Sequence, residues 1–489
     1  MQLNSSSVST LPATVAVPSY DRSKVTVGIV HFGVGGFHRS HQAMYVDRLL
    51  NAGEALEWGI CGVGALPHDS RIRDVMRDQD CLYTLELKNA DGSRDLRVIG
   101  SIVEFLFAPE DPEAVIERMT DPAVRIVSLT ITEGGYNFDQ VTGEFDLTNP
   151  AVVKDAALTS PPETVFGLIV EALARRRERG VEPFTVMSCD NIQGNGDVAK
   201  RSFAAYARLR DAALGDWVER EVAFPNSMVD RITPVTSDDD RDEIAAHLGV
   251  TDAWPVVAEP FEQWALEDHF PQGRPAFEAV GVQLVDDVEP YELMKLRLLN
   301  ATHQGMCYFG YLAGYRYAHE ASADPAMAQF LLDYMHSEAT PTLRPVPGVD
   351  LDAYKRTLIE RYRNPEVRDT LARLCAESSD RIPKWLLPVV REQLARDGSV
   401  TNSAAIVASW ARYAEGVDEQ GEPIDVVDRL REQLVPIARS QRGNPLAFIQ
   451  NRSVFGDLVD DERFTTPYLA ALESLHERGA KVTYSSLVE

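Results

Sequence analysis

The chain has 489 residues, of which 44% are hydrophobic and 25% charged, enough for two or three domains of ~150 residues each. Its formal net charge of −27 repels nucleic-acid phosphates and anionic lipids, which argues against nucleic acid or membrane as a partner. No stretch of ~18 uninterrupted apolar residues occurs, and the N-terminus lacks the pattern of a secretion signal. The five cysteines include no CxxC pair, so a reducing cytoplasm is expected rather than a disulfide framework.

Apolar, β-rich runs alternate with helical patterns in the first part of the chain. Strands are expected over 25–34, 57–65, 124–135 and 183–191, and helices over 38–53 and 165–180. This alternation predicts an α/β fold with a doubly wound parallel sheet of the Rossmann type. From residue 288 onward helical patterns dominate, over 291–315, 326–337, 351–376, 384–396, 402–415, 424–440 and 465–478. We therefore expect a Rossmann-type domain over 1–286 and a mainly α-helical domain over 287–489.

A glycine cluster, Gly33-Val34-Gly35-Gly36, directly follows the first expected strand. A dinucleotide site needs one glycine for the tight strand-to-helix turn. It needs another so that the backbone can approach the pyrophosphate, which rests on the helix N-terminus. His38 stands where the GxGxxG pattern has its last glycine. The cluster predicts a dinucleotide loop, and the alternative is an ordinary turn.

Asp69 follows the second expected strand and is the candidate that binds the adenosine ribose. A carboxylate there also repels a 2′-phosphate, which favours NAD over NADP. Its distance from Gly33 exceeds the usual ~20 residues. The alternative is that Asp69 only caps the helix that begins at Ser70.

His38 and His41, three residues apart, could suggest a metal site. No group of acidic, histidine or cysteine residues completes such a site in the sequence, so we expect no metal.

The segment 291–312 is predicted to form one helix, in which Lys295, Asn300 and His303 interrupt an apolar pattern. At ~100° per residue, Asn300 is offset from Lys295 by ~140° and His303 by ~80°. Glu292 lies at ~60°, so all four fall on one broad face. The alternative is an ordinary solvated helix face.

These residue types fit the oxidation of an alcohol by hydride transfer to a nicotinamide. The alcohol proton must leave, and a lysine can accept it if burial or a neighbouring positive charge lowers its pKa. Neutral amides can stabilise the alkoxide that forms. Asn300 is one such amide, and Asn191, at the end of the expected strand 183–191, is a second. The sequence therefore favours a dehydrogenase with Lys295 as its base.

Five segments carry a family resemblance: GVGGFHRSHQ, TITEGGY, SCDNIQGNG, FPNSMVDRITP and KLRLLNATHQ. In this order and spacing the chain resembles the polyol-specific long-chain dehydrogenases over essentially its whole length. Within that family it is most similar to the members that oxidise D-mannitol to D-fructose. The resemblance implies NAD as cofactor, no catalytic metal and a monomer.

The resemblance also implies roles for single residues. Lys295 would be the general base, Asn191 and Asn300 would hold the reacting oxygen, and His303 would orient the substrate. Glu292 and Glu133 would carry the proton between Lys295 and solvent. Further contacts are implied with the substrate for Asp230, Arg373, Arg381 and Lys384, and with the cofactor for Gly33, Val34, Gly35, Gly36, Phe37, His38, Asp69, Thr132 and Glu133. Arg381 departs from the family, whose closest members carry Lys there.

For three of these residues the alternative is an ordinary structural role. Asp230 could form a plain ion pair with Arg231, Glu133 could be a turn residue, and Arg373 could be a solvated helix position.

The expected reaction is D-mannitol + NAD⁺ ⇌ D-fructose + NADH + H⁺. Within the family, the alternatives are a fructuronate or tagaturonate reductase and an arabinitol or sorbitol dehydrogenase. A uronate would need a cationic pocket, which Arg373, Arg381 and Lys384 could supply. A third alternative, a regulator that binds NAD without turnover, predicts a decayed active site.

Overall fold

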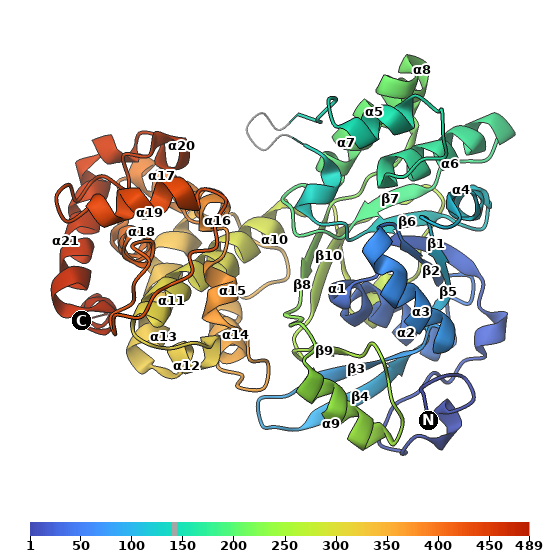
Figure 1. Ribbon diagram of the computed structural model, residues 1–489, viewed down its shortest axis with the longest axis horizontal. Coiled ribbons are helices and arrows are strands. Elements are labelled where there is room, and N and C mark those ends of the chain that lie inside the picture. The colour runs from blue at the N-terminus through green and yellow to red at the C-terminus, as the bar shows by residue number, and fades with distance from the viewer. Residues whose placement is uncertain (139–143, 489) are drawn as a thin grey trace. The chain divides into compact units, whose positions relative to one another are not determined.

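The computed structural model describes residues 1–138 and 144–488. Two compact units make up the chain, Met1–Glu289 and Pro290–Glu489 (Figure 1). The first unit contains both strands and helices, and the described residues of the second form helices.

A five-stranded sheet forms the centre of the N-terminal unit. Its strands are β1 (Val27–Phe32), β2 (Gly59–Gly64), β5 (Ile102–Phe107), β6 (Ile126–Leu129) and β7 (Thr185–Ser188). They lie in the order β5-β2-β1-β6-β7, and every pairing is parallel. The strand order reverses between β1 and β6, which is where open α/β sheets bind their ligands.

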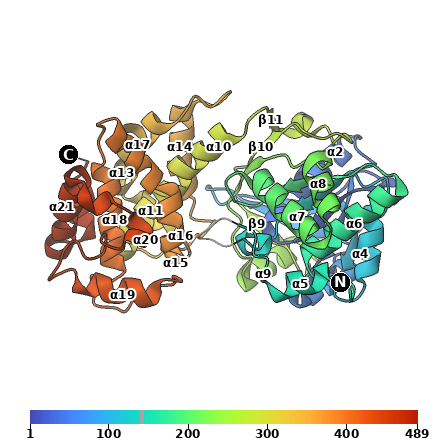
Figure 2. The ribbon, with the colours of Figure 1, turned by 90° about the horizontal axis from the view of Figure 1, so that it is seen from above.

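Both faces of this sheet are covered. On one face, side chains such as Val30 and Val127 belong to a hydrophobic core shared with four helices: α4 (Pro112–Thr120), α6 (Val165–Arg179), α7 (Asn195–Arg210) and α8 (Ala212–Glu221). Ile29 and Ile126, one residue earlier, face a second core with α2 (Gln42–Asn51) and α3 (Ser70–Asp78). Helices α7 and α8, which both contribute to the first core, lie side by side (Figure 2). The expected doubly wound Rossmann-type fold is confirmed.

Two smaller sheets complete the N-terminal unit, and the sequence patterns did not predict them. One contains β4 (Arg94–Ile99), β3 (Tyr83–Lys88) and β9 (Val256–Ala258), and the other β11 (Gln283–Val285), β10 (Gln263–Glu267) and β8 (Ser227–Asp230). The remaining helices are α1 (Gly36–Ser40), α5 (Pro150–Ala156) and α9 (Asp238–Leu248), with 3-10 turns η1 (Val8–Thr10), η2 (Arg22–Lys24), η3 (Pro67–Asp69), η4 (Glu133–Tyr136) and η5 (Phe277–Val280).

The C-terminal unit contains helices and no strand among its described residues. Its helices are α10 (Glu289–Met294), α11 (Ala301–Leu312), α12 (Ala318–Ala323), α13 (Pro325–Tyr334), α14 (Leu351–Tyr362), α15 (Leu371–Cys375), α16 (Ser378–Trp385), α17 (Leu387–Ala395), α18 (Thr401–Tyr413), α19 (Arg431–Ser440), α20 (Arg452–Phe455), α21 (Glu462–Arg478) and α22 (Ala480–Ser485). Two π-helical segments, η6 (Lys295–Asn300) and η7 (Met335–Ala339), and two 3-10 turns, η8 (Thr340–Thr342) and η9 (Leu458–Asp460), join them. Helix α11 is central, because it contacts α12, α13, α15, α16, α18 and α22.

Several expected helices differ in extent from those observed. The helix expected over 38–53 is broken at His41, whose backbone leaves the helical region. The one expected over 351–376 divides around Asn364, because a residue before proline disfavours helical dihedrals. The one expected over 424–440 begins only at Arg431. The one expected over 291–315 ends at Leu312 and changes its hydrogen-bonding pattern on the way.

Two further features follow from the described residues. None of their helices is long and apolar enough to cross a membrane. All five cysteines are buried and none forms a disulfide.

Candidate active site

The glycine-rich loop lies at the point where the strand order reverses. Gly33 has a φ of +91°, and a Cβ there would lie 2.1 Å from the carbonyl oxygen of Thr130, which follows β6. The Gly33 carbonyl accepts hydrogen bonds from the Gly35 N–H and the Thr130 hydroxyl, both at 2.7 Å. A Cβ on Gly35 would meet only that carbonyl oxygen, at 3.9 Å, so a ligand has room to approach the backbone. This geometry fits a dinucleotide pyrophosphate at the start of α1.

Two buried histidines, His31 and His38, pack beside this loop. The rings of His31 and His38 stack with centroids 3.3 Å apart. Burial lowers the pKa of His31 to about 3 and that of His38 well below its ordinary value, so both are neutral. His31 therefore donates from Nε2 to the Gly33 carbonyl (3.2 Å) and accepts at Nδ1 from Ser128 (2.8 Å). His38 is buried inside the protein, whereas its position in the loop predicted a contact with the cofactor.

Both ring nitrogens of His41 form hydrogen bonds within the protein. Its Nε2 donates to the Gln263 carbonyl at 3.0 Å, and its Nδ1 accepts from Gln42 at 2.9 Å. The described residues contain no group of three or more side chains that could hold a metal ion. The other two residues of the loop pack locally: Val34 is buried, and Phe37 stacks on His41.

Replacing Gly33 with alanine should damage this loop. The forced left-handed backbone costs ~1–3 kcal/mol, and the clash with Thr130 adds to it. We expect a lower melting temperature and at least ~10-fold weaker NADH binding, measured by thermal unfolding and fluorescence titration. Gly35→Ala is the matched control, since Gly35 has a φ of −85°. It should leave stability unchanged and weaken NADH binding only, and equal stability losses in both variants would contradict this account.

Asp69 ends the 3-10 turn η3, just before α3 begins. Its Oδ2 accepts the N–H of Leu66 at 2.9 Å, at the start of η3. Its side chain accepts no hydrogen bond from the described residues of α3, so the capping of that helix expected by the alternative interpretation is not observed. Because Asp69 follows β2, the neighbour of β1, it also lies at the carboxyl edge of the sheet. The contact with Leu66 uses one carboxylate oxygen, and binding of a ribose by Asp69 stays a prediction.

Thr132, in the loop after β6, has φ 64° and ψ 169°, a conformation almost restricted to glycine. The buried carboxylate of Asp190 holds it there, accepting the N–H of Thr132 at 2.7 Å and that of Ile131 at 3.1 Å. Tyr136 donates to the same carboxylate at 2.7 Å, and burial raises the pKa of Tyr136 so that it keeps its proton. Backbone strain of ~1–3 kcal/mol persists only where the surroundings fix it, and it is concentrated at functional sites.

The Asp190 contacts tie the end of β7 to the end of β6. Asn191, the next residue, is therefore carried at the carboxyl edge of the sheet, and its side chain is exposed. Glu133 opens the turn η4, but its side chain lies outside the described part of the chain.

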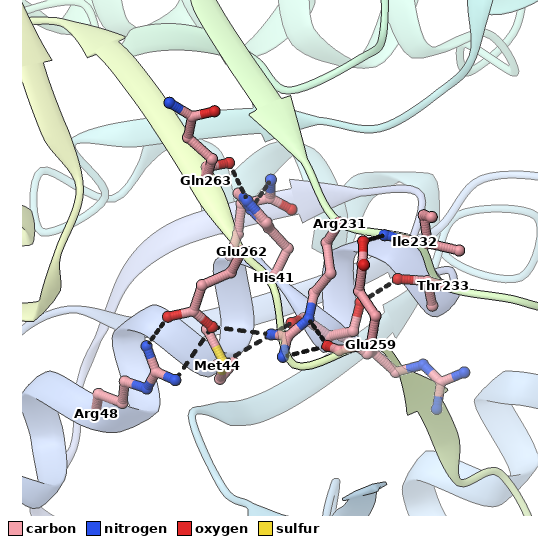
Figure 3. Close-up of polar contacts among 12 residues, drawn as sticks. His41, Met44, Arg48, Arg231, Ile232, Thr233, Glu259, Glu262 and Gln263 are labelled. Carbon is pink, nitrogen blue, oxygen red and sulfur yellow. Dashed lines mark hydrogen bonds and ion pairs between the residues drawn. The ribbon is translucent and has the colours of Figure 1, made fainter. Parts of the chain in front are cut away.

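Asp230 is the last residue of β8 and is 4% exposed. Its neighbour Arg231 forms its ion pair with Glu262 at 3.1 Å (Figure 3). The same guanidinium donates to the carbonyl of Glu259 at 2.9 and 3.0 Å and to that of Ser40, in α1, at 2.7 Å. Arg231 thereby ties the end of β8, and with it Asp230, to the helix that follows the glycine-rich loop.

The polar residues of the predicted catalytic helix are buried in the second unit. Glu292 is 6% exposed, Lys295 8%, Asn300 5% and His303 8%. A solvated helix face is therefore ruled out. No described residue accepts a hydrogen bond from the buried amide nitrogen of Asn300. Buried donors in native proteins are nearly always paired, so a donor without a partner calls for an explanation, of which a catalytic role is one.

The angular prediction for this helix was wrong in one respect. Residues Lys295–Asn300 form a π-helical segment, in which the Ala301 N–H bonds the carbonyl of Leu296, five residues back. A π turn holds more residues than an α turn, so Lys295 and Asn300 lie nearer to one face than the ~140° of an ideal α-helix. Such π segments occur frequently at functional sites.

The three basic residues expected at the substrate differ in their surroundings. Arg373, in α15, forms a two-bond ion pair with Asp369 at 2.6 and 2.7 Å and is half-exposed. Arg381 donates to the carbonyls of Arg373 (3.1 Å) and Leu374 (3.0 Å), so the two arginines are neighbours. Lys384 is exposed. Asp369 balances the charge of Arg373 but not those of Arg381 and Lys384, so the need of a uronate for a cationic pocket does not exclude this cluster.

Family comparison accords with this geometry. Residues 27–279 match the Mannitol dehydrogenase Rossmann domain, and residues 287–476 match the Mannitol dehydrogenase C-terminal domain. The chain belongs to the mannitol dehydrogenase family. This confirms the expected relationship and makes the chain an enzyme of the polyol dehydrogenase class.

The similarity to these relatives extends over almost the whole chain. It is 45% identical to the mannitol 2-dehydrogenase of Phaeosphaeria nodorum over 99% of this chain and 85% of the relative. The structure of the Pseudomonas fluorescens mannitol 2-dehydrogenase, in ternary complex with NAD and D-mannitol, aligns with a TM-score of 0.89 and 43% identity, covering 100% and 99% of the two chains. A substrate-free D-sorbitol dehydrogenase aligns with a TM-score of 0.93 and 37% identity, covering 99% and 100%.

Sequence reasoning missed the residues that support the site. Asp190 stood next to Asn191 in the motif SCDN, and Thr302 stood between Asn300 and His303, so motif position could have drawn attention to both. The ring centroid of Tyr362 lies 4.8 Å from that of His303. Tyr362 is distant from His303 in the sequence, and no motif around it indicated a role in the site.

Proposed function

We propose that this chain catalyses the reversible oxidation of D-mannitol to D-fructose with NAD, and that Lys295 is the general base. The observation that carries the proposal is the buried amide of Asn300, a donor without a partner among the described residues, on the same helix as the buried Lys295. An alkoxide oxygen is the ligand that both groups suit. The family and the P. fluorescens complex with NAD and D-mannitol support the choice of substrate and cofactor.

The chain's own residues divide the work as follows. The loop Gly33–Gly36 would hold the pyrophosphate, and Asp69 the adenosine ribose, which favours NAD over NADP. Bound NAD supplies the acceptor for the hydride. As the hydride leaves C2 with its electron pair, Lys295 takes the proton of the C2 hydroxyl, and the C2–O bond becomes a carbonyl.

Other residues hold the oxygen and move the proton. Asn300 and Asn191 donate hydrogen bonds to the developing alkoxide, and His303 orients the polyol. Glu292, one turn before Lys295 and also buried, passes the proton onward, with Glu133 as a second relay. Asp230 and Arg373 bind substrate hydroxyls.

Oxidation of D-sorbitol is the second candidate, favoured by the TM-score of 0.93 to the D-sorbitol dehydrogenase. The two polyols differ in configuration at C2. Uronate reduction is the third candidate, since Asp369 balances Arg373 but leaves the charges of Arg381 and Lys384.

A substrate panel tests the proposal. Initial rates of NADH formation would be measured with D-mannitol, D-sorbitol and D-arabinitol, with NAD and NADP, and of NADH oxidation with D-fructose and D-fructuronate. We expect the highest kcat/KM for D-mannitol with NAD. A preference for D-sorbitol would select the second candidate, and a preference for D-fructuronate would contradict both. NADH binding without any turnover would instead indicate a regulator.

A cytoplasmic, monomeric enzyme is also proposed. Five buried cysteines without a disulfide suit a reducing compartment. Light scattering after gel filtration would give the molar mass directly, and a value near 54.3 kDa is expected.

A further inference from the structure

The helix that carries Lys295 changes from α to π hydrogen bonding at that residue and returns to α after Asn300. The first and last residues of the π segment are thus the proposed base and the proposed oxyanion donor. Their mutual orientation depends on the π turn, because an α turn would rotate Asn300 farther from Lys295. Whatever holds the π turn in place also sets the geometry of these two side chains.

Side-chain hydroxyls bond the carbonyls of this segment. Thr302 Oγ1 donates to the carbonyl of Leu298 and lies 3.0 Å from that of Leu299. Tyr362 Oη, from the end of α14, lies 3.2 Å from the Leu299 carbonyl and 2.8 Å from Thr302 Oγ1. Both side chains are buried. The Leu298 carbonyl also accepts the backbone N–H of Ala301, so the two hydroxyls add side-chain hydrogen bonds to carbonyls at the end of the π segment.

Tyr362 has a second contact in the site. Its ring lies against the imidazole of His303, with centroids 4.8 Å apart. One side chain from α14 therefore touches both the π turn and the residue expected to orient the substrate.

We propose that Tyr362 and Thr302 are positioning residues, whose hydroxyls hold the π turn so that Lys295 and Asn300 act on the same oxygen. This inference rests on the proposed roles of Lys295 and Asn300. The two residues do not touch the reacting atoms themselves. Their loss should therefore lower kcat by misplacing the catalytic groups, while NADH binding is unchanged.

Conservative variants test this directly. Tyr362→Phe keeps the ring against His303 and removes the hydroxyl, and Thr302→Val keeps the shape of the side chain. Each should lower kcat for D-mannitol by ~10- to 100-fold, because small misplacements of reacting groups carry that cost. Thr302→Ser, which restores a hydroxyl, should recover most of the rate. Tyr484→Phe is the control, since the Tyr484 hydroxyl bonds Asp324 at 2.9 Å elsewhere in the unit, and it should keep its kcat.

A double-mutant cycle separates positioning from general stability. In an Asn300→Ala background, Tyr362→Phe should have less than ~2-fold further effect, because the group that it positions is gone. An undiminished effect in that background, or a wild-type kcat in both Tyr362→Phe and Thr302→Val, overturns the inference. If Lys295→Ala also turns over normally, the proposed function fails as well. If Lys295→Ala is inactive, only the positioning role fails.

Discussion

Replacing Lys295 with alanine should lower kcat for D-mannitol oxidation by ~10²- to 10⁴-fold, the usual contribution of a general base. The lysine is 8% exposed, so it does not serve as a surface charge that solvent could replace. NADH binding should survive, because the glycine-rich loop belongs to the other unit. Stopped-flow rates and a fluorescence titration with NADH would measure the two effects separately.

The control for this variant is a buried lysine with a structural role. Lys355 is 2% exposed and bonds Asp352 and His336, both at 2.7 Å. The side chains of His336 and Asp352 are 50% and 66% exposed, and neither residue is assigned to the site. Lys355→Met should therefore change stability and leave kcat near the wild-type value, whereas Lys295→Met should be as inactive as Lys295→Ala. Near-normal turnover in either Lys295 variant would remove it as the base.

The second large effect is expected at Asn300. Asn300→Ala removes one oxyanion donor, which typically costs ~10²- to 10³-fold in kcat. KM for D-mannitol should change much less, because the bond is strongest when the oxygen carries charge. Unfolding should show little loss of stability, since the amide nitrogen has no partner among the described residues to lose. Steady-state kinetics and thermal unfolding on the same preparation would check all three statements.

Asn451 offers a matched comparison for Asn300. Its amide nitrogen is also buried without a partner among the described residues, but it precedes the short helix α20. Asn451→Ser should keep kcat, which would show that an unsatisfied amide matters only beside Lys295. A strong kcat loss at Asn451, or a large KM effect with unchanged kcat at Asn300→Ala, would argue against the oxyanion role.

The main architecture could be predicted because its signals are local. The strand ending at Phe32 is apolar and is followed at once by Gly33, whose positive φ makes the turn. The helices of the second unit show regular apolar spacing. The small sheets were missed, since strands such as Val256–Ala258 are too short to give a pattern.

The candidate site was predicted only where residue type alone carries the chemistry. Lys295, Asn300 and His303 stood out as polar residues in an apolar helix. The π turn between the first two could not be seen, because a period of 3.6 residues was assumed throughout. Asp190 and Tyr362 act through contacts with segments far away in sequence, which only the folded chain brings together.

The most direct test is reduction of D-fructose with NADH that carries deuterium at the transferable position, followed by identification of the product. We predict D-mannitol with one deuterium at C2, formed by the wild-type chain and lost in Lys295→Ala. Formation of D-sorbitol, or no reduction of D-fructose at all while D-fructuronate is reduced, would contradict the account.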